Sequence, residues 1–409
     1  MDYATVPDDH EETYGRVLSY AFSPERGPDP DVEGPDRPES FHRRGVYDVP
    51  DGSSPAEHEA TDLAAVCGYY DFSGRIRGAF RRVGGVSAVA SPPERRRGGT
   101  VREMLGELHA EFRSEGIDFA ALWPFKYSFY RRLGYARVND YARLTLPPDE
   151  LDGAVPRPAG AFVRLAPDDW ERLDAVHAAA ATEPLGLDRT EGWWRRRVFR
   201  SWRTDPFVYG WERNGELRGY VVYTVEEGDD DGKTFLAQEL VGVDERARRH
   251  LLRFARNHDS QVERIRFTAR ADTRLFDRLE DPGSVETEIK PGPMFRLVDV
   301  AAGLSAVSYP AHVAGEAVLD VTDDHCDWND DTFRLSLADG SATCERVAGG
   351  ADADVSLGVG ALSRLAVGSH SLDRLVELDS IAVEPGGEDA RVTLEAAFPG
   401  TEPFLREGF

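Results

Sequence analysis

The chain of 409 residues is too long for one ordinary hydrophobic core, and its length predicts two or three domains. Its 74 acidic residues outnumber the 49 basic ones, and the net charge of −25 excludes nucleic acid as a partner, because the phosphates would be repelled. An apolar content of 41% excludes a disordered chain. Since the Debye length falls to about 3 Å at ~1 M salt, such an acidic surface favours a halophilic source, an archaeon.

The sequence has no secretory signal and no apolar run long enough to cross a membrane, so we expect a cytoplasmic protein without a membrane partner. The three cysteines, Cys67, Cys326 and Cys344, lie far apart and lack metal-ligand spacing. The ten histidines form no H-E-x-x-H or similar cluster, and we expect His109 on the surface of its helix. We therefore predict neither a disulfide framework nor a metal site.

The chain begins with a predicted helix at residues 8–22, which carries apolar side chains on one face. Residues 23–50 are rich in Pro, Gly and Asp and predict a loop with one helical turn at 39–44. Residues 63–70 and 76–81 predict antiparallel strands that lead into the centre of the first domain.

An uncharged run at residues 83–90 predicts a strand buried on both faces, which ends before Pro92 and Pro93. Residues 95–100, Arg-Arg-Arg-Gly-Gly-Thr, then open a helix that stops near Gly116. Unpaired N–H groups at a helix start, small residues and arginines suit a pyrophosphate. Neither G-x-G-x-x-G nor a Walker loop is present, and a solvated basic turn explains these residues equally well.

A short strand at residues 119–122 and a short helix ending in a glycine, at 128–135, complete this stretch. The whole stretch resembles the GNAT superfamily of acyl-CoA-dependent N-acetyltransferases. Arg95, Gly98 and Thr100 match its motif Q/R-x-x-G-x-G/A, with threonine as a departure at the last position. Within that superfamily it resembles the Eis (enhanced intracellular survival) acetyltransferases. The resemblance implies an α/β (α+β) fold: two tandem GNAT folds followed by a sterol-carrier-protein-like α+β domain.

The rest of the chain agrees with that order of domains. Residues 136–146 predict the last strands of the first domain, and Pro147-Pro148 suggests a boundary. The second segment repeats the strand–helix–strand order without the glycines, so the resemblance implies a degenerate GNAT domain; an unrelated α/β domain is the alternative. Its expected elements are a helix after Asp168, strands at 207–212, 217–225, 240–243 and 262–269, a hairpin turn at Asn214-Gly215 and a helix at 245–258.

The third segment predicts strands and helices of similar length. We expect strands at 317–321, 332–337, 354–357 and 392–394, a turn at Asp339-Gly340, and helices at 358–367 and 372–378. The predicted domains are therefore residues 1–147, a catalytic GNAT domain; 148–305, a degenerate GNAT domain; and 306–409, a sterol-carrier-like domain.

The resemblance implies acetyl-CoA as a co-substrate and assigns roles to single residues. Tyr130 is implied as general acid, because a tyrosine with an ordinary pKa of about 10 keeps its proton at neutral pH and can donate it to a thiolate. Packing as a buried aromatic is the alternative for Tyr130. The carboxylate of Phe409 is implied as general base. The implied acetyl-CoA-binding residues are Ala88, Val89, Ala90, Arg95, Arg96, Arg97, Gly98, Gly99 and Thr100.

The implied function is transfer of an acetyl group from acetyl-CoA to the primary amine of a small molecule or peptide, by direct attack. The alternative is a lipid- or partner-binding protein that uses its C-terminal domain and has a silent acetyltransferase domain. The resemblance also implies a homo-oligomer, a hexamer. Gly408 stands where mycobacterial relatives have an acidic residue and Phe125 where they have a small polar one, which puts their aminoglycoside preference in doubt.

Overall fold

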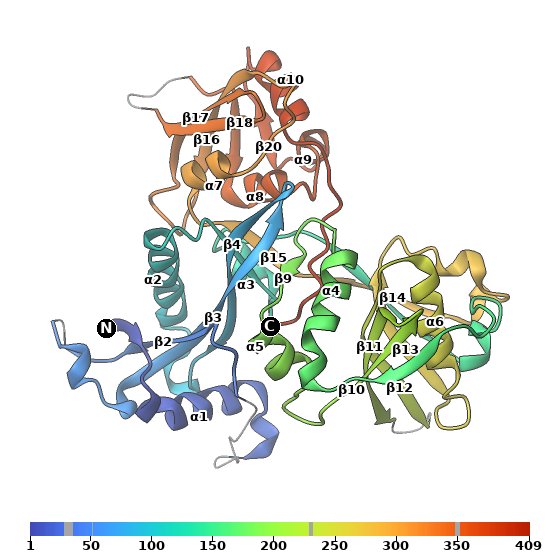
Figure 1. Ribbon diagram of the computed structural model, residues 1–409. Coiled ribbons are helices and arrows are strands. Elements are labelled where there is room, and N and C mark those ends of the chain that lie inside the picture. The colour runs from blue at the N-terminus through green and yellow to red at the C-terminus, as the bar shows by residue number, and fades with distance from the viewer. Residues whose placement is uncertain (28–35, 51, 229–231, 348–351) are drawn as a thin grey trace.

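The computed structural model describes residues 1–27, 36–50, 52–228, 232–347 and 352–409. Within these ranges the chain forms three β-sheets, each with helices packed on it, in three lobes (Figure 1). No helix among the described residues has both the length and the apolar character needed to span a membrane.

The first sheet has the strand order β1-β2-β3-β4-β5-β15-β6, with β9 paired to β3. Its strands are β1 Asp2–Thr5, β2 Phe41–Tyr47, β3 Leu63–Ile76, β4 Ala79–Ala90, β5 Phe119–Leu122, β6 Ala136–Arg137, β9 Leu187–Asp188 and β15 Met294–Leu297. Helices α1 Glu11–Phe22, α2 Thr100–Ser114 and α3 Tyr127–Arg131 pack against it. The strand predicted at residues 119–122 is confirmed as β5, and it is buried along its whole length.

Two expectations for this lobe were wrong. Residues 39–44 do not form a helical turn, because β2 begins at Phe41 and pairs with β3. The strand expected at 76–81 is not separate: Arg77 and Gly78, with φ of 44° and 85°, form a hairpin turn, and one continuous strand, β4, follows. The apolar run at 83–90 is therefore the second part of a longer strand, whose first part carries charged residues.

The second sheet has the order β14-β7-β13-β12-β11-β10-β8. Its strands are β7 Asp140–Leu146, β8 Ala161–Arg164, β10 Phe207–Arg213, β11 Glu216–Glu227, β12 Lys233–Gly242, β13 Arg264–Arg270 and β14 Glu286–Pro291. Its helices are α4 Trp170–Ala180, α5 Glu191–Trp193, a π-helix Trp194–Val198 and α6 Glu245–Arg256. The hairpin turn predicted at Asn214-Gly215 is confirmed, with φ of 57° and 83°.

The first two sheets exchange strands, which the sequence analysis did not anticipate. Residues 136–146 were expected to close the first sheet, but only β6 does so, whereas β7 pairs with β13 and β14 of the second sheet. In return, β15 follows the second sheet in sequence and inserts between β5 and β6 of the first. The exchange joins the two lobes more tightly than a single linker could.

The third sheet has the order β18-β17-β16-β19-β20. Its elements are β16 Gly315–Thr322, β17 Asp331–Ala338, β18 Ser341–Arg346, β19 Val355–Gly358 and β20 Ile381–Val383, with α7 Val300–Ala306, α8 Val359–Val367, α9 Leu372–Glu377 and α10 Glu388–Ala397. The strand expected at 392–394 was wrong. Ala390, Leu394 and Ala397 are buried at helical spacing on α10, whereas Val392 is 65% exposed.

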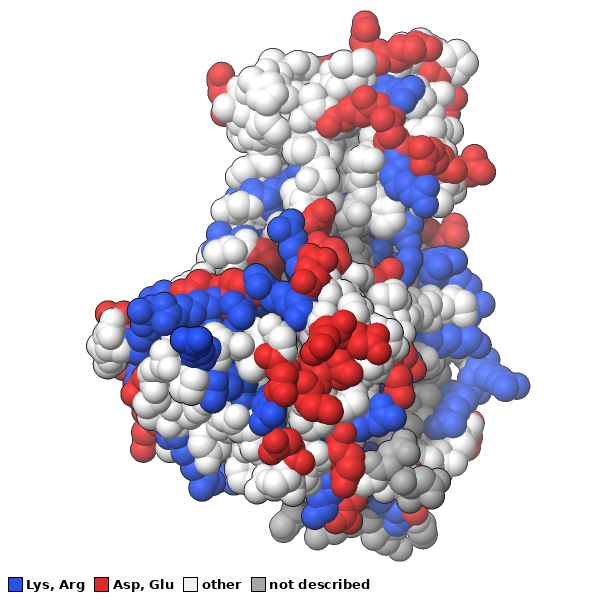
Figure 2. All heavy atoms as spheres, turned by 90° about the vertical axis from the view of Figure 1, so that its right-hand side faces the viewer, with Lys and Arg blue, Asp and Glu red and all other residues white. Residues whose placement is uncertain are grey.

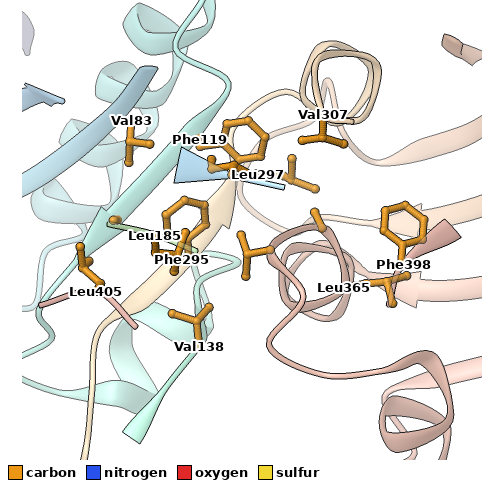
Figure 3. Close-up of a cluster of buried hydrophobic side chains, with 14 of the residues drawn as sticks. Val83, Phe119, Val138, Leu185, Phe295, Leu297, Val307, Leu365, Phe398 and Leu405 are labelled. Atoms are coloured by element: carbon orange, nitrogen blue, oxygen red, sulfur yellow. The ribbon is translucent and has the colours of Figure 1, made fainter. Parts of the chain in front are cut away.

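Buried apolar side chains join the third lobe to the first (Figure 3). Phe119 of β5 and both Phe295 and Leu297 of β15 belong to the same cluster as Leu365 of α8 and Phe398. Beside it, the buried guanidinium of Arg296 pairs with the Asp323 carboxylate and donates to the Leu133 carbonyl. The chain then returns from the third lobe and ends between the first two (Figure 1).

Candidate functional site

Strands β4 and β5 separate in the middle of the first sheet. They pair in parallel from Val83 and Phe119 to Val86 and Leu122, where their pairing ends. Just beyond, Ala88 has a φ of 55°, and the register of β4 against β3 shifts by one residue. Such a bulge bends the strand and leaves backbone groups unpaired. The bulge therefore opens the sheet where the strands diverge and frees backbone N–H groups for a ligand.

A cavity of about 600 Å³ extends from this opening to the start of α2. Two residues in the left-handed region, Arg97 with φ 66° and Gly99 with φ 95°, turn the chain into the helix, and Gly99 is its N-cap. The first N–H groups of a helix lack acceptors within it and lie at its positive end. The predicted residues that line this cavity are Val89, Ala90, Arg95, Arg96, Arg97, Gly99 and Thr100.

The three arginines have different surroundings. Arg95 pairs with Asp48 at 2.5 Å, and Arg96 donates from Nε to the Ser91 carbonyl at 3.2 Å. The exposed side chain of Arg97 has no hydrogen-bond or ion-pair partner among the described residues. Gly98 has open space around it, because an added Cβ would meet nothing closer than the Arg95 carbonyl oxygen at 3.9 Å. The fold therefore requires glycine at 99 but not at 98.

Tyr130 lies on α3, which follows the end of β5. Its side chain is buried, with ring centroids of Phe125, Phe129 and Tyr135 at 5.4, 5.1 and 6.0 Å. Its hydroxyl makes no hydrogen bond within the part of the chain that is described. Burial, and secondarily the neighbouring Cys67, raises the pKa of Tyr130 above its ordinary value. The residue thus packs as an aromatic and also holds its proton firmly.

The last residue, Phe409, lies against the first sheet, and Glu407 just before it is buried. The Phe409 ring packs on Phe72 and Tyr70 of β3, with centroids 5.0 and 6.1 Å apart. The Glu407 carbonyl accepts from Trp123 Nε1 at 2.7 Å, and the Gly408 carbonyl accepts from Arg197 Nη2 at 3.1 Å. Among the described residues, neither a hydrogen bond nor a ring contact joins Phe409 to Tyr130 or to residues 95–100.

A buried ion network holds this segment, and the sequence analysis did not find it. Arg189 pairs with Glu407 at 2.8 Å and with Glu239 at 2.9 Å, and His177 Nε2 lies 3.5 Å from the Glu407 carboxylate. Burial lowers the pKa of His177, and the Arg189 charge adds to this effect. Local sequence offers no signal for these contacts, because Arg189 and Glu407 lie 218 residues apart.

His109 is not on the surface, contrary to expectation. It is fully buried on α2 and lies 2.8 Å from the Tyr135 hydroxyl through Nε2. His325 and Cys326 come close to it, and ligand atoms of the three lie within 4.8 Å of one another. Burial, and then the Arg296 charge, lowers the pKa of His325 to about 4. The positive charge of the nearby Arg296 guanidinium disfavours a bound cation, although two histidines and a cysteine are suitable metal ligands.

Comparison with known proteins gives the same order of domains. Residues 2–138 and 185–297 match family models described as acetyltransferase (GNAT) domains, and residues 300–406 match a sterol carrier protein domain. An uncharacterized N-acetyltransferase of Streptomyces coelicolor is 28% identical over 315 residues, 73% of this chain and 75% of that protein. The N-acetyltransferase Eis of Mycobacterium tuberculosis is 27% identical over 377 residues, 88% of each chain.

Solved structures agree on the fold. A probable N-acyltransferase of Enterococcus faecalis has a TM-score of 0.83 at 20% sequence identity, and the match covers 100% of this chain and 99% of that one. GNAT acetyltransferases use acetyl-CoA in general. With two GNAT domains, a sterol carrier protein domain and Eis-like relatives, this chain is an acyltransferase of the GNAT N-acetyltransferase type.

Proposed function

We propose that the protein transfers the acetyl group of acetyl-CoA to a primary amine by direct attack, with Tyr130 as general acid and the Phe409 carboxylate as general base. The observation that carries the proposal is the cavity between the bulge at Ala88 and the start of α2. Its arginines and unpaired helix N–H groups suit the pyrophosphate of CoA, and the bulge offers N–H groups to a polarised thioester carbonyl.

The reaction balances with the groups available. The neutral amine attacks the thioester carbonyl, its nitrogen forms the amide bond, and the carbon–sulfur bond breaks. The departing thiolate takes the proton of Tyr130, which burial keeps on the hydroxyl. The proton released by the amine passes through water to the Phe409 carboxylate. Because an α-carboxylate has an ordinary pKa of only about 3.5, it acts mainly by holding the amine and ordering that water.

The alternative, a binding protein with a silent acetyltransferase domain, has less support. The third lobe buries its apolar side chains against one another: Leu335 of β17, Leu357 of β19 and Leu362 of α8 belong to one packed cluster. Its described contacts with the rest of the chain include the buried pair of Arg296 and Asp323 and the return of the C-terminal segment. Both features suit a structural part that delivers Phe409 to the first lobe.

The test is a titration of acetyl-CoA in multimolar KCl, followed by an assay of CoA release with a panel of small-molecule and peptide amines. We expect binding, and release of CoA that depends on the amine. If the protein does not bind acetyl-CoA, the proposed function is wrong. If acetyl-CoA binds but no primary amine causes release of CoA, the cavity binds the co-substrate and the proposed reaction is wrong.

A further inference from the structure

A second cavity, of about 300 Å³, lies on the other side of the bulge in β4. Ser87 and Ala88 of β4 line it, while the following residues, Val89 and Ala90, line the first cavity. Phe22 of α1 borders both. Two cavities that meet at one bulge are what a two-substrate transfer needs, so this inference rests on the proposed function and assigns the second cavity to the acceptor amine.

Four arginines line this second cavity, which we call the arginine pocket. They are Arg26, Arg37, Arg197 and Arg203. None of the described lining residues is acidic, although the whole chain carries 74 acidic residues against 49 basic ones. Within the described ranges, none of the four makes an ion pair, whereas arginines just outside the pocket do so: Arg196 pairs with Glu39 and Arg200 with Asp205. Among the residues that the structure describes, the positive charge of this pocket is therefore not balanced by carboxylates.

Arg197 is the most constrained of the four. It lies on the π-helix Trp194–Val198 of the second lobe and reaches into a pocket of the first. Its guanidinium lies 5.8 and 5.5 Å from the ring centroids of Tyr70 and Trp193 and donates to the Gly408 carbonyl. Its Nε is buried and has no hydrogen-bond partner. A buried donor without an acceptor is unfavourable, and an anionic ligand at this position would supply the missing acceptor.

Leu18, Phe22, Tyr70 and Trp202 give much of the rest of the lining an apolar character, and the serines Ser19, Ser23 and Ser87 add hydroxyl groups. Such a surface favours an apolar or aromatic body between the amine and the anionic group. A cationic acceptor would meet four positive charges at close range, none of which forms an ion pair with a described residue.

From this geometry we infer that the acceptor is a primary amine that also carries an anionic group on an apolar body, and not a polycation. The amine lies toward the bulge at Ala88 and the Phe409 terminus. The anionic group lies against Arg197 and the more exposed Arg26 and Arg203. Arginine forks bind carboxylate and phosphate alike, so the shared chemistry is an anion of either kind.

A matched series of amines tests this inference. Phenethylamine is compared with derivatives that carry a carboxylate, a phosphate or an aminomethyl group at the para position, which share its body and differ in the sign of the added charge. We expect kcat/KM for one or both anionic amines to exceed that of the aminomethyl amine by about tenfold or more. The ratio between carboxylate and phosphate identifies which anion the pocket takes.

Variants test the residues. Arg26 and Arg203 are exposed, and no described hydrogen bond or ion pair involves their side chains, so the double variant Arg26→Gln/Arg203→Gln will fold. It should lower the ratio of kcat/KM for the anionic amine to kcat/KM for phenethylamine roughly tenfold. Arg200→Gln is the matched control, because Arg200 lies on the same loop outside the pocket and should change neither rate.

Equilibrium binding of the amines, followed by tryptophan fluorescence, separates this inference from the proposed function. A preference for the anionic amine that the double variant loses would support the pocket even without turnover. A wild-type protein that acetylates the aminomethyl amine best would overturn the inference and leave the acetyltransferase proposal intact. An anion preference that survives in both the double variant and Arg197→Gln would also overturn it, because the arginines would not be its cause.

Discussion

Tyr130 combines the two properties that a proton donor to a thiolate needs at neutral pH. Its hydroxyl has no hydrogen-bond partner among the described residues, so the proton is free to be transferred. Burial raises the pKa of Tyr130 above its ordinary value, so the proton is present at neutral pH, although the same shift makes the hydroxyl a weaker donor to a thiolate. An aspartate or glutamate at this position would ordinarily be ionised and have no proton to give.

We predict that Tyr130→Phe lowers kcat by a hundredfold or more, within the range of about 10²–10⁴ for general acid catalysis. The affinity for acetyl-CoA should stay unchanged, because the residues expected to hold it lie at 95–100. The loss of a hydroxyl without partners leaves the fold intact. Because the folded-state pKa is raised, wild-type activity should not fall through deprotonation of Tyr130 as the pH rises from 7 to 9. Unchanged kcat in the variant would make Tyr130 a packing residue only.

Single residues differ in how far the sequence can predict them. The loop at 95–100 could be predicted because its charge, its glycines and its place before a helix are all local signals. Arg197 could not, because it enters the pocket from another lobe. Glu407 contacts Arg189 because the C-terminal segment runs back to the first two lobes. The sequence of α2 suggests a surface position for His109, but His325 and Cys326 of the third lobe pack against it. Contacts between distant segments leave no local pattern.

The C-terminal segment is an element without regular secondary structure that is nevertheless fixed along its length. The Phe404 amide donates to the Pro184 carbonyl at 2.9 Å, and the Leu405 amide donates to Asn139 Oδ1 at 3.3 Å. Glu407 forms the buried ion pair with Arg189, and the Phe409 ring packs on β3. Most chain ends lack such anchors.

We predict that a C-terminal tag, or deletion of Phe409, sharply lowers turnover and leaves acetyl-CoA affinity near normal. An added residue moves the terminal carboxylate by ~3.5 Å, and a misplacement of ~1 Å can cost about a hundredfold in rate. The matched control is the same tag at the N-terminus, where Met1 is exposed and precedes β1. Equal turnover of the two tagged forms, measured by CoA release, would show that the terminus has no part in the reaction.

Elements with strong local signals were predicted well. The hairpin at Asn214-Gly215 and helix α6 agree with their sequences, because a turn type and an amphipathic pattern fix them. The strand exchange of β7 and β15 was missed, since strand patterns do not specify which sheet a strand joins. Helix α10 was mistaken for a strand because Val392 and Leu394 alternate with a polar residue over a short distance.

On the scale of the whole molecule, charge dominates the surface. Figure 2 shows acidic side chains gathered in the middle of the face that looks out from the second sheet, with basic side chains flanking them. Many described arginines pair with carboxylates, but exposed pairs each contribute only about 0–1 kcal/mol. Dissolved salt must therefore screen the repulsion that arises from the net charge of −25.

We predict that the protein loses structure on dialysis to low salt, because unscreened carboxylates then repel one another. Far-UV circular dichroism should report a folded protein at ~3 M KCl and substantial loss of structure at ~0.1 M, since screening differs several-fold between these conditions. Sucrose at low salt is the control, because it favours compact states without screening charge. Identical spectra at both salt concentrations would count against a halophilic protein.

We also predict a closed homo-oligomer, a hexamer by resemblance to Eis-type enzymes. Three-lobed subunits offer heterologous surfaces, and such surfaces generate a closed ring when the rotation between neighbours closes. Light scattering in high salt should give a mass of about six chains. A monomer at all protein concentrations would refute this assembly.

We propose that the cavity between the β4 bulge and the start of α2 binds acetyl-CoA, and calorimetry of the Gly98→Val variant tests this binding. An added side chain at 98 meets nothing closer than 3.9 Å, so the fold tolerates valine, whereas a pyrophosphate lying against the loop would not. We expect the wild-type protein to bind acetyl-CoA in high salt, and the variant, with an unchanged circular dichroism spectrum, to lose that binding. Equal affinity in the two proteins would contradict the claim.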